Sequence, residues 1–307
     1  MSMKLTRRQA LAATAAAPAA AALAPGLATA GGHAAPSPLN ARTFSLGAFE
    51  VTTLLSGSMP RDNAQGIFGM NVSEEEFAEV SADNFISNDA VQFFFTPTLV
   101  RTGSETILFD TGLNQEGITG ALADAGVTAD EITHVVLTHM HGDHIGGMNG
   151  DAGETFKNAA YITGRVEFDT SNTADNERFQ QKVAPYAERF SFLEAGQDVT
   201  SGVTSMDASG HTPGHMAYML ESEGQQLALI ADTANHHVWS LGYPEWEVRF
   251  DRDKAAAAAT RKRLLGMLAA DKMPFIGYHM PFPALGYVAP RGEGGFQYVP
   301  HSYQLLG

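Results

Sequence analysis

One short segment of the sequence gathers three histidines and an aspartate. Residues His139 to His144 read His-Met-His-Gly-Asp-His and come shortly after the apolar run Ile132 to Leu137. Neutral imidazole is the commonest metal ligand near neutral pH, and alternate residues that leave a strand into a glycine-containing loop can point several side chains at one volume. The alternative is a solvated, histidine-rich loop. The spacing favours a metal site whose ligands are presented at the end of a strand.

Further histidines and a carboxylate stand where later elements are expected to end. The tight turn Gly210 to His215 carries two histidines, Asp232 closes an apolar strand pattern, and His279 closes another. Ligand sites form where the ends of strands converge. We therefore expect these side chains to join the first group.

The composition limits what can hold a metal and what the protein can bind. The 307 residues include no cysteine, which excludes disulfides, thiolate nucleophiles, iron–sulfur clusters and every zinc site that uses sulfur. Any metal must be held by histidines and carboxylates. Lys and Arg number 19 against 34 Asp and Glu, a formal charge of −15. Because no basic field exists for a nucleic-acid backbone or anionic lipid, neither nucleic acid nor stable membrane association is expected.

The first thirty residues have the three-part layout of a signal peptide. A basic start with Arg7 and Arg8 leads into an alanine-rich stretch that ends on small residues, and Thr6 to Leu11 resembles the twin-arginine export signal. We expect residues 1–30 to be cleaved after export by the twin-arginine machinery, which leaves a periplasmic or secreted protein. Residues 31–40, mostly Gly, Pro, Ser and Ala, are expected to form a flexible lead-in.

Strand and helix signals alternate through the rest of the chain. Short apolar or alternating runs bounded by turn residues predict strands over Phe44–Leu55, Gln92–Arg101, Thr106–Asp110, Ile132–Thr138, Ala159–Thr163, Ala217–Glu221, Gln226–Asp232 and Pro274–His279. Side chains that can cap a helix predict helix starts at Ser73 with Glu76, at Asn114 for a helix ending near Asp124, and at Asp253 for a helix over Lys254–Ala270. Groups of strands with interspersed helices indicate one layered α/β domain over residues 41–307.

The order and spacing of the metal-ligand candidates resemble the metallo-β-lactamase superfamily. Its pattern is His-x-His-x-Asp-His, then a distant histidine, a bridging aspartate and a last histidine, and the match spans nearly the whole predicted domain. The resemblance implies a four-layer αββα sandwich with two metals at one edge. It implies a first metal held by His139, His141 and His215, a second held by Asp143, His144 and His279, and Asp232 as the bridge between them. One departure is Ala231, where members of the family usually have glycine.

Seven nitrogen and oxygen donors suit two ions, because one catalytic zinc accepts three or four protein ligands. Two ions about 3.5–4 Å apart can share a water whose pKa falls to about 7, which gives a hydroxide at neutral pH. We expect two divalent ions, with zinc as the default, and hydrolysis by this bridging hydroxide. Asp232 and Asp143 are the expected catalytic carboxylates, with Asp232 as proton acceptor. The redox branch of the family usually has Glu where His141 stands, so His141 argues for hydrolysis.

Two residues beside the ligands are expected to support them. Asp110, in the segment Phe109 to Gly112, matches a family motif whose aspartate sits behind the ligands, and we expect it to orient a histidine ring. His211, the first histidine of the turn before His215, is expected to have a supporting role of the same kind.

Three segments resemble the exported branch of the family that contains methyl parathion hydrolase and related lactonases. They are the turn Ser209–His215, the stretch His279–Gly286 and the closing run Phe296–Pro300. This resemblance implies an apolar substrate pocket walled by Phe168, Trp239 and Phe282.

The expected activity is hydrolysis of a lactone or a related apolar ester, with acyl-homoserine lactones among the candidate substrates. The lack of cysteine disfavours the β-lactamase subclasses that hold their second metal with it, and residues Gly294–Gly307 lack the basic residues with which glyoxalase-type thioesterases grip glutathione. Two alternatives stay open: an organophosphate triester hydrolase of the methyl parathion hydrolase type, and a periplasmic metal-binding protein without catalysis. The complete ligand set favours an enzyme.

Overall fold

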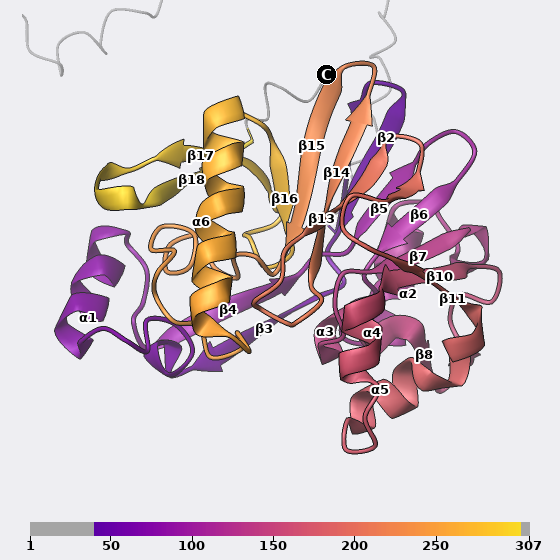
Figure 1. The fold of residues 1–307 in the computed structure, drawn as a ribbon, viewed down its shortest axis with the longest axis horizontal. Coiled ribbons are helices and arrows are strands. Elements are labelled where there is room, and N and C mark those ends of the chain that lie inside the picture. The colour runs from indigo at the N-terminus through magenta and orange to yellow at the C-terminus, as the bar shows by residue number, and fades with distance from the viewer. Residues whose placement is uncertain (1–39, 302–307) are drawn as a thin grey trace, which may run out of the picture. The chain divides into compact units, whose positions relative to one another are not determined.

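Residues 40–301 are described by a computed structural model, and all of them belong to one compact unit. Two seven-stranded sheets form the middle of this unit, and helices cover their outer faces (Figure 1). The predicted export signal, residues 1–30, and the lead-in up to residue 39 lie outside the described residues. Among residues 40–301, no helix is both long enough and apolar enough to cross a membrane.

The first sheet combines an antiparallel half and a parallel half. Its strands, in spatial order, are β1 (Ala41–Leu46), β2 (Phe49–Leu54), β5 (Thr98–Arg101), β6 (Thr106–Phe109), β7 (His134–Leu137), β10 (Ala160–Gly164) and β11 (Phe190–Leu193). The pairs from β1 to β6 are antiparallel, and those from β6 to β11 are parallel. The carboxyl ends of the parallel strands therefore meet at one edge of the sheet.

The second sheet is antiparallel except at one pair. Its strands, in spatial order, are β12 (Asp198–Thr200), β13 (Val203–Asp207), β14 (Met216–Ser222), β15 (Gln225–Ala231), β16 (Phe275–Gly277), β17 (Leu285–Pro290) and β18 (Phe296–Pro300). Strands β15 and β16 are parallel, so both end at the same edge of this sheet. Two separate hairpins add β3 (Gly57–Asp62) with β4 (Ala90–Phe95), and β8 (Asn149–Gly150) with β9 (Gly153–Glu154).

Helices lie outside both sheets. The α-helices are α1 (Glu74–Asp83), α2 (Gln115–Asp124), α3 (Gly142–Ile145), α4 (Arg165–Ser171), α5 (Glu177–Lys182) and α6 (Lys254–Asp271). Short 3₁₀ turns occur at η1 (Ala64–Gly66), η2 (Ala129–Glu131), η3 (Gly146–Met148), η4 (Ala184–Arg189) and η5 (Gly292–Gly294). In Figure 1, α6 crosses in front of the second sheet, α2, α4 and α5 gather beside the first, and the hairpin β3–β4 runs along the lower side.

Alternating side chains of each strand bury two different cores. Phe109 points between the sheets, where its ring lies 5.0 Å from that of Tyr218 in β14. Its neighbour Leu108 points the other way and packs with residues of α2, α4 and α5, including Ile118. On the far side, Leu264 of α6 packs on the second sheet. The layers therefore follow the order helix, sheet, sheet, helix, as expected.

Several predicted helix starts are present. Ser73 accepts a hydrogen bond from the Glu76 amide at the start of α1, Asn114 accepts one from the Gly117 amide at the start of α2, and Asp253 accepts one from the Ala256 amide at the start of α6. These side chains take up amide groups that the first turn of a helix leaves unpaired.

Two predicted strands were wrong in their continuity. The run Phe44–Leu55 is a hairpin, because Gly47 turns the chain with a φ of 57° and packs too closely on Ser222 to admit a side chain. The run Gln92–Arg101 is divided between β4 and β5 at Pro97, which has no amide hydrogen for a sheet. This break matters for the site, because it puts β4 in a hairpin that reaches the metal-ligand candidates.

Candidate metal centre

Strand β7 delivers the histidine-rich segment to the edge of the sandwich. Val135 to Leu137 are fully buried in the first sheet, and the chain then leaves the strand with His139 and His141 before the single turn of α3. Gly147 follows this turn, and a Cβ there would lie 2.1 Å from the carbonyl oxygen of Thr111. The glycine is required because the loop lies directly on the backbone that follows β6.

One group of ligand candidates lies beside the turn that joins β13 and β14 in the second sheet. It contains His139, His141, His211 and Asp232, whose ligand atoms all lie within 4.8 Å of one another. Nδ1 of His141 is 3.0 Å from Nε2 of His139 and 2.9 Å from Nε2 of His211. Three ring nitrogens therefore face one small volume, where a shared cation would satisfy all of them.

A second group lies beside the first. It contains Asp143, His144 and His279, again within 4.8 Å of one another. Asp232 reaches this group too: its Oδ1 is 3.2 Å from Nε2 of His144, and its Oδ2 is 3.2 Å from Nε2 of His279. Since Oδ2 is also 3.3 Å from Nε2 of His211, this carboxylate lies between the two groups.

A strained residue places Asp232. Ala231 ends β15 with a φ of 42°, at an irregularity in the pairing with β16. This left-handed conformation favours glycine, the usual residue of the family at this position, so Ala231 holds a strained backbone where glycine would not. The side-chain Nδ2 of Asn235 donates to Oδ2 of Asp232 at 2.9 Å. The aspartate is thus held by backbone geometry and by hydrogen bonds to Asn235, His279 and His215.

The turn between β13 and β14 brings a different histidine to the site from the one expected. His211, and not His215, lies in the first group. Nδ1 of His215 instead donates to the carbonyl of Ala208 at 2.9 Å, and its Nε2 accepts from the backbone amide of Asp232 at 3.3 Å. His215 therefore joins the turn to the backbone behind Asp232. His211 takes the place among the ligand candidates that we expected for His215, so both expected roles were wrong.

Behind His211 lies a buried ion pair that the sequence did not reveal. Nδ1 of His211 is 2.9 Å from Oδ1 of Asp251, whose Oδ2 accepts from Arg261 at 2.7 Å. Arg261 is fully buried in α6 and also donates to the carbonyl of Thr233 at 2.8 Å. Burial disfavours a charged ring, but hydrogen bonds to Asp232 and Asp251 outweigh it and raise the pKa of His211 to about 9. Carboxylates behind a ligand fix the ring and raise its basicity.

Asp110 occupies the corresponding place behind His144. Its Oδ2 is 2.8 Å from Nδ1 of His144, and its Oδ1 accepts from the backbone amide of Thr138 at 2.8 Å. This contact leaves Nε2 of His144 pointing into the second group. The ring of Tyr278 lies 3.9 Å from the same imidazole at an interplanar angle of 31°, and its hydroxyl donates to the carbonyl of Asp143 at 2.5 Å.

A buried glutamate joins the two histidine loops. Glu167 of α4 accepts from the backbone amide of Met140 at 2.9 Å through Oε1, and from Thr212 at 2.7 Å and Gly214 at 3.1 Å through Oε2. The side chain is almost completely inaccessible. In the sequence Glu167 is an ordinary helical residue, so no pattern marks it. It holds the loop that carries His141 against the turn that carries His211.

The free donor atoms fit metal ions. Nε2 of His144 and Oδ1 of Asp232 are buried and make no hydrogen bond with the described residues. Burial, together with neighbouring histidines, holds the pKa of His139 and His141 well below the usual range, so their rings are neutral and offer a lone pair. Buried imidazole nitrogens and carboxylate oxygens of this kind match the ligand preferences of zinc and similar divalent ions.

A cavity of about 280 Å³ opens onto both groups. His141, Asp143, Asp232 and His279 face it, and its apolar wall consists of Phe93, Phe95, Leu113 and Phe250. The Asp143 side chain is 24% exposed, whereas that of Asp232 is 4% exposed, so Asp143 is the more accessible carboxylate.

The three aromatic residues expected to wall the substrate pocket lie elsewhere. Phe168 packs in the core with Phe179 and Phe190, and Trp239 donates to Ser81 beside a separate cavity of about 220 Å³. Phe282 does not line the cavity over the metal-ligand candidates. The expectation was wrong because the wall comes from Phe93 and Phe95 of β4 together with Leu113 and Phe250. The run of three phenylalanines, Phe93 to Phe95, was the available signal.

Comparisons with known proteins agree with this architecture. Residues 96–275, well over half of the chain, match the sequence profile of the Metallo-beta-lactamase superfamily. An N-acyl homoserine lactonase from Bacillus cereus is 26% identical over 166 residues, which cover 53% of this chain and 62% of that protein. The alignment thus spans about three fifths of the length of this curated relative.

Two solved structures extend the comparison over most of the chain. The first is AidC, a dizinc quorum-quenching lactonase in complex with a product, with a TM-score of 0.79 and 26% identity, covering 87% of this chain and 99% of that one. The second is the hydrolase AbOPH of the beta lactamase superfamily, with a TM-score of 0.80 and 23% identity, covering 86% and 98%; at this identity it shows a shared fold. The sandwich, the convergence of histidines and aspartates at its edge and the profile match lead to one conclusion: the chain belongs to the metallo-beta-lactamase superfamily.

Proposed function

We propose that this protein is a hydrolase of lactones or related esters that depends on two divalent metal ions, with zinc as the first candidate. The observation that carries the proposal is the position of Asp232, whose two oxygens lie 3.2 Å from His144 and His279 on one side and 3.3 Å from His211 on the other. N-acyl homoserine lactones are the first substrates to test, because the curated relatives and AidC are named as lactonases.

The two groups of residues would each hold one ion. The first would be held by His139, His141 and His211, the second by Asp143, His144 and His279, and both would contact Asp232. Two bound ions would polarise the carbonyl of the substrate and lower the pKa of water to about 7. His211 replaces His215 in this set because only His211 faces the other ligands.

The protein's own residues would orient the substrate and handle the proton. Oδ1 of Asp232 makes no hydrogen bond with the described residues, so it can accept the proton released when water attacks. Asp143 is accessible from the cavity and can contact the reacting group. The buried rings of Phe93 and Phe95 and the exposed ring of Phe250 form an apolar wall that can hold an acyl chain.

A comparison of substrates tests the proposal. The metal-reconstituted protein is assayed for ring opening of acyl-homoserine lactones and for hydrolysis of aryl esters and aryl phosphotriesters, ranked by kcat/KM. We expect lactones or esters to rank first. An enzyme of the methyl parathion hydrolase type would rank the phosphotriesters first, and a metal-binding protein without catalysis would hydrolyse none of them.

One pair of variants separates the role of the site from a general effect of charge. Asp232→Ala should lower kcat on the best substrate by at least about 100-fold, because a nucleophile misplaced by about 1 Å costs that factor. Asp207→Ala removes an exposed carboxylate that pairs with Arg263 on the surface, and should change kcat little. Equal activity of both variants and the wild type, with metal bound, would exclude Asp232 from the reaction.

We also propose that residues 1–30 direct export through the twin-arginine machinery to the periplasm or the medium. The paired arginines Arg7 and Arg8, followed by the alanine-rich stretch, support this proposal. Export is measured by fractionating cells that express the full chain.

A further inference from the structure

Two arginines line the same cavity as the metal-ligand candidates. Arg61 comes from β3, and Arg178 comes from α5, so two elements far apart in the sequence each contribute one. Both side chains are exposed. Neither arginine has a place in the lactone chemistry proposed above.

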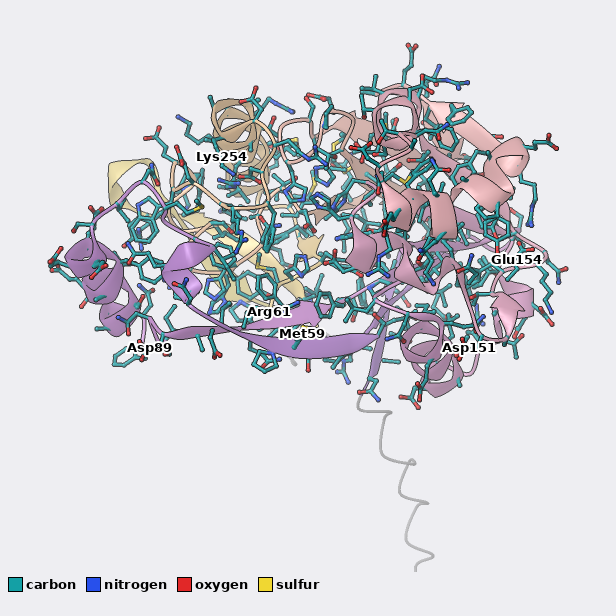
Figure 2. The ribbon with its side chains drawn as sticks, turned by 90° about the horizontal axis from the view of Figure 1, so that it is seen from below. Met59, Arg61, Asp89, Asp151, Glu154 and Lys254 are labelled. Atoms are coloured by element: carbon teal, nitrogen blue, oxygen red, sulfur yellow. The ribbon has the colours of Figure 1, made fainter. Side chains whose placement is uncertain are left out.

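The strand register directs Arg61 to the cavity. In the hairpin β3–β4, Arg61 is paired with Val91 and Met59 with Phe93. Paired residues share one face of a hairpin, and positions two apart along a strand share it too. Arg61 therefore lies on the face that carries Phe93, one of the aromatic walls. Figure 2 shows Arg61 and Met59 on this hairpin.

Arg178 of α5 reaches the cavity beside the loop that carries His141 and Asp143. Its Nε would lie 3.1 Å from a Cβ at Gly142, the glycine between His141 and Asp143. The guanidinium stem therefore lies over the loop that carries the metal-ligand candidates. Because Gly142 has no side chain, Arg178 can approach this loop closely.

Neither arginine is neutralised by the described protein. Within residues 40–301, Arg61 and Arg178 donate no hydrogen bond and lie within 4.0 Å of no carboxylate, whereas Arg101, Arg189 and Arg261 each pair with one. The chain as a whole carries a formal charge of −15, so two unpaired positive charges at one cavity are opposite in sign to the net charge of the protein. Guanidinium groups bind carboxylates through two parallel hydrogen bonds, and two of them beside an apolar wall suit an anion on an extended chain.

We propose that the substrate carries a carboxylate in addition to the bond that is cleaved, and that Arg61 and Arg178 bind this carboxylate at the mouth of the cavity. This inference rests on the proposed function and names the class of ester or lactone that the site prefers. The aromatic wall formed by Phe93 and Phe250 would contact the apolar chain between the carboxylate and the scissile group. Because the arginines would act in substrate binding, their loss should raise KM and leave kcat largely unchanged.

The test compares two esters that differ only in charge. The mono-4-nitrophenyl ester of adipic acid has a free carboxylate, and its terminal carboxamide analogue is neutral and of the same shape. The ratio of their kcat/KM values is measured for the two-metal wild type and for Arg61→Gln, Arg178→Gln and the double variant. Arg263→Gln serves as the matched control, because Arg263 is an exposed arginine on α6 that pairs with Asp207 away from the cavity.

We expect the wild type to prefer the carboxylate. Each cavity variant should lower this preference about fivefold by raising KM for the carboxylate ester, which is the size of effect that an exposed ion pair gives. Arg263→Gln should leave the preference unchanged. High salt should reduce the preference of the wild type, because exposed charges are screened. A preference that is absent in the wild type, or that survives in the double variant, would overturn the proposal.

A binding measurement keeps this proposal separate from the proposed function. The dissociation constants of hexanoate and hexanamide for the same proteins, obtained by calorimetry, need no hydrolysis. If no ester or lactone is cleaved but hexanoate binds better through Arg61 and Arg178, the proposed reaction fails and the anion site stands. If neutral esters are cleaved but the two arginines do not affect either ratio, the anion site fails and the reaction stands.

Discussion

Replacing His211 with alanine should weaken the binding of the first metal ion about 100-fold, whereas replacing His215 should not. Nε2 of His211 lies 2.9 Å from Nδ1 of His141 and 3.3 Å from Oδ2 of Asp232. Both ring nitrogens of His215 are already used, by the Ala208 carbonyl and the Asp232 amide. The two histidines are four residues apart in one turn, so the comparison isolates the direction in which each ring points.

The magnitude follows from the number of donors. A four-ligand zinc site binds with about 10–16 kcal/mol, so one ligand in four contributes roughly 3 kcal/mol, or about 100-fold in affinity. His215→Ala leaves the backbone amide of Asp232 without its buried acceptor. This loss should cost about 1–3 kcal/mol of folding stability and change the affinity for the first ion by less than about tenfold.

The assay measures bound zinc against buffered free zinc for the wild type and both variants. Circular dichroism and urea unfolding of the metal-free proteins check that each variant is folded. The reasoning would be refuted if His215→Ala lost an ion while His211→Ala bound both ions with wild-type affinity.

Three other predictions concern the support of the site, acid stability and export. Glu167→Ala should lower the free energy of unfolding by about 3 kcal/mol or more, because three donors lose a buried charged acceptor; an unchanged urea midpoint would contradict this. Burial lowers the pKa of His237 to about 4 in the folded protein, below its unfolded value of about 6.5. As the pH falls from about 6.5 towards 4, the unfolded chain binds a proton that the folded protein does not, so the folded protein loses stability. His237→Gln should therefore reduce the acid-induced loss of stability by about 1–2 kcal/mol, and superimposable pH profiles of variant and wild type would argue against it. Arg7→Lys combined with Arg8→Lys should block export, and normal accumulation of the mature protein outside the cytoplasm would show that another route is used.

The layered fold and the region of the site could be predicted from local patterns. Histidines occupy alternate positions after the buried run that ends at Leu137, and the polar residues Asp232 and His279 each close an apolar run. Each of these signals lies within the sequence of a single strand and the residues that follow it. The helix starts at Asn114 and Asp253 could also be predicted from local sequence, since each side chain accepts a hydrogen bond from a backbone amide three residues away.

Contacts between distant segments could not be predicted in this way. Whether His211 or His215 faces the ligands depends on how the β13–β14 turn packs against Asp251, which lies 40 residues from His211. Likewise, Glu167 holds loops from two different sheets, and its neighbours in the sequence say nothing about either loop. The cavity wall was misassigned because Phe93 acts through a hairpin that the continuous strand pattern concealed.

The most direct test of the central claim is the metal content of the reconstituted protein. After purification, loading with zinc and removal of excess metal, elemental analysis should give about two ions per chain, because Asp232 is shared by two groups of ligand candidates. Asp232→Ala should bind fewer than two under the same conditions. A wild-type content of one ion or none, in folded protein, would contradict the two-metal site.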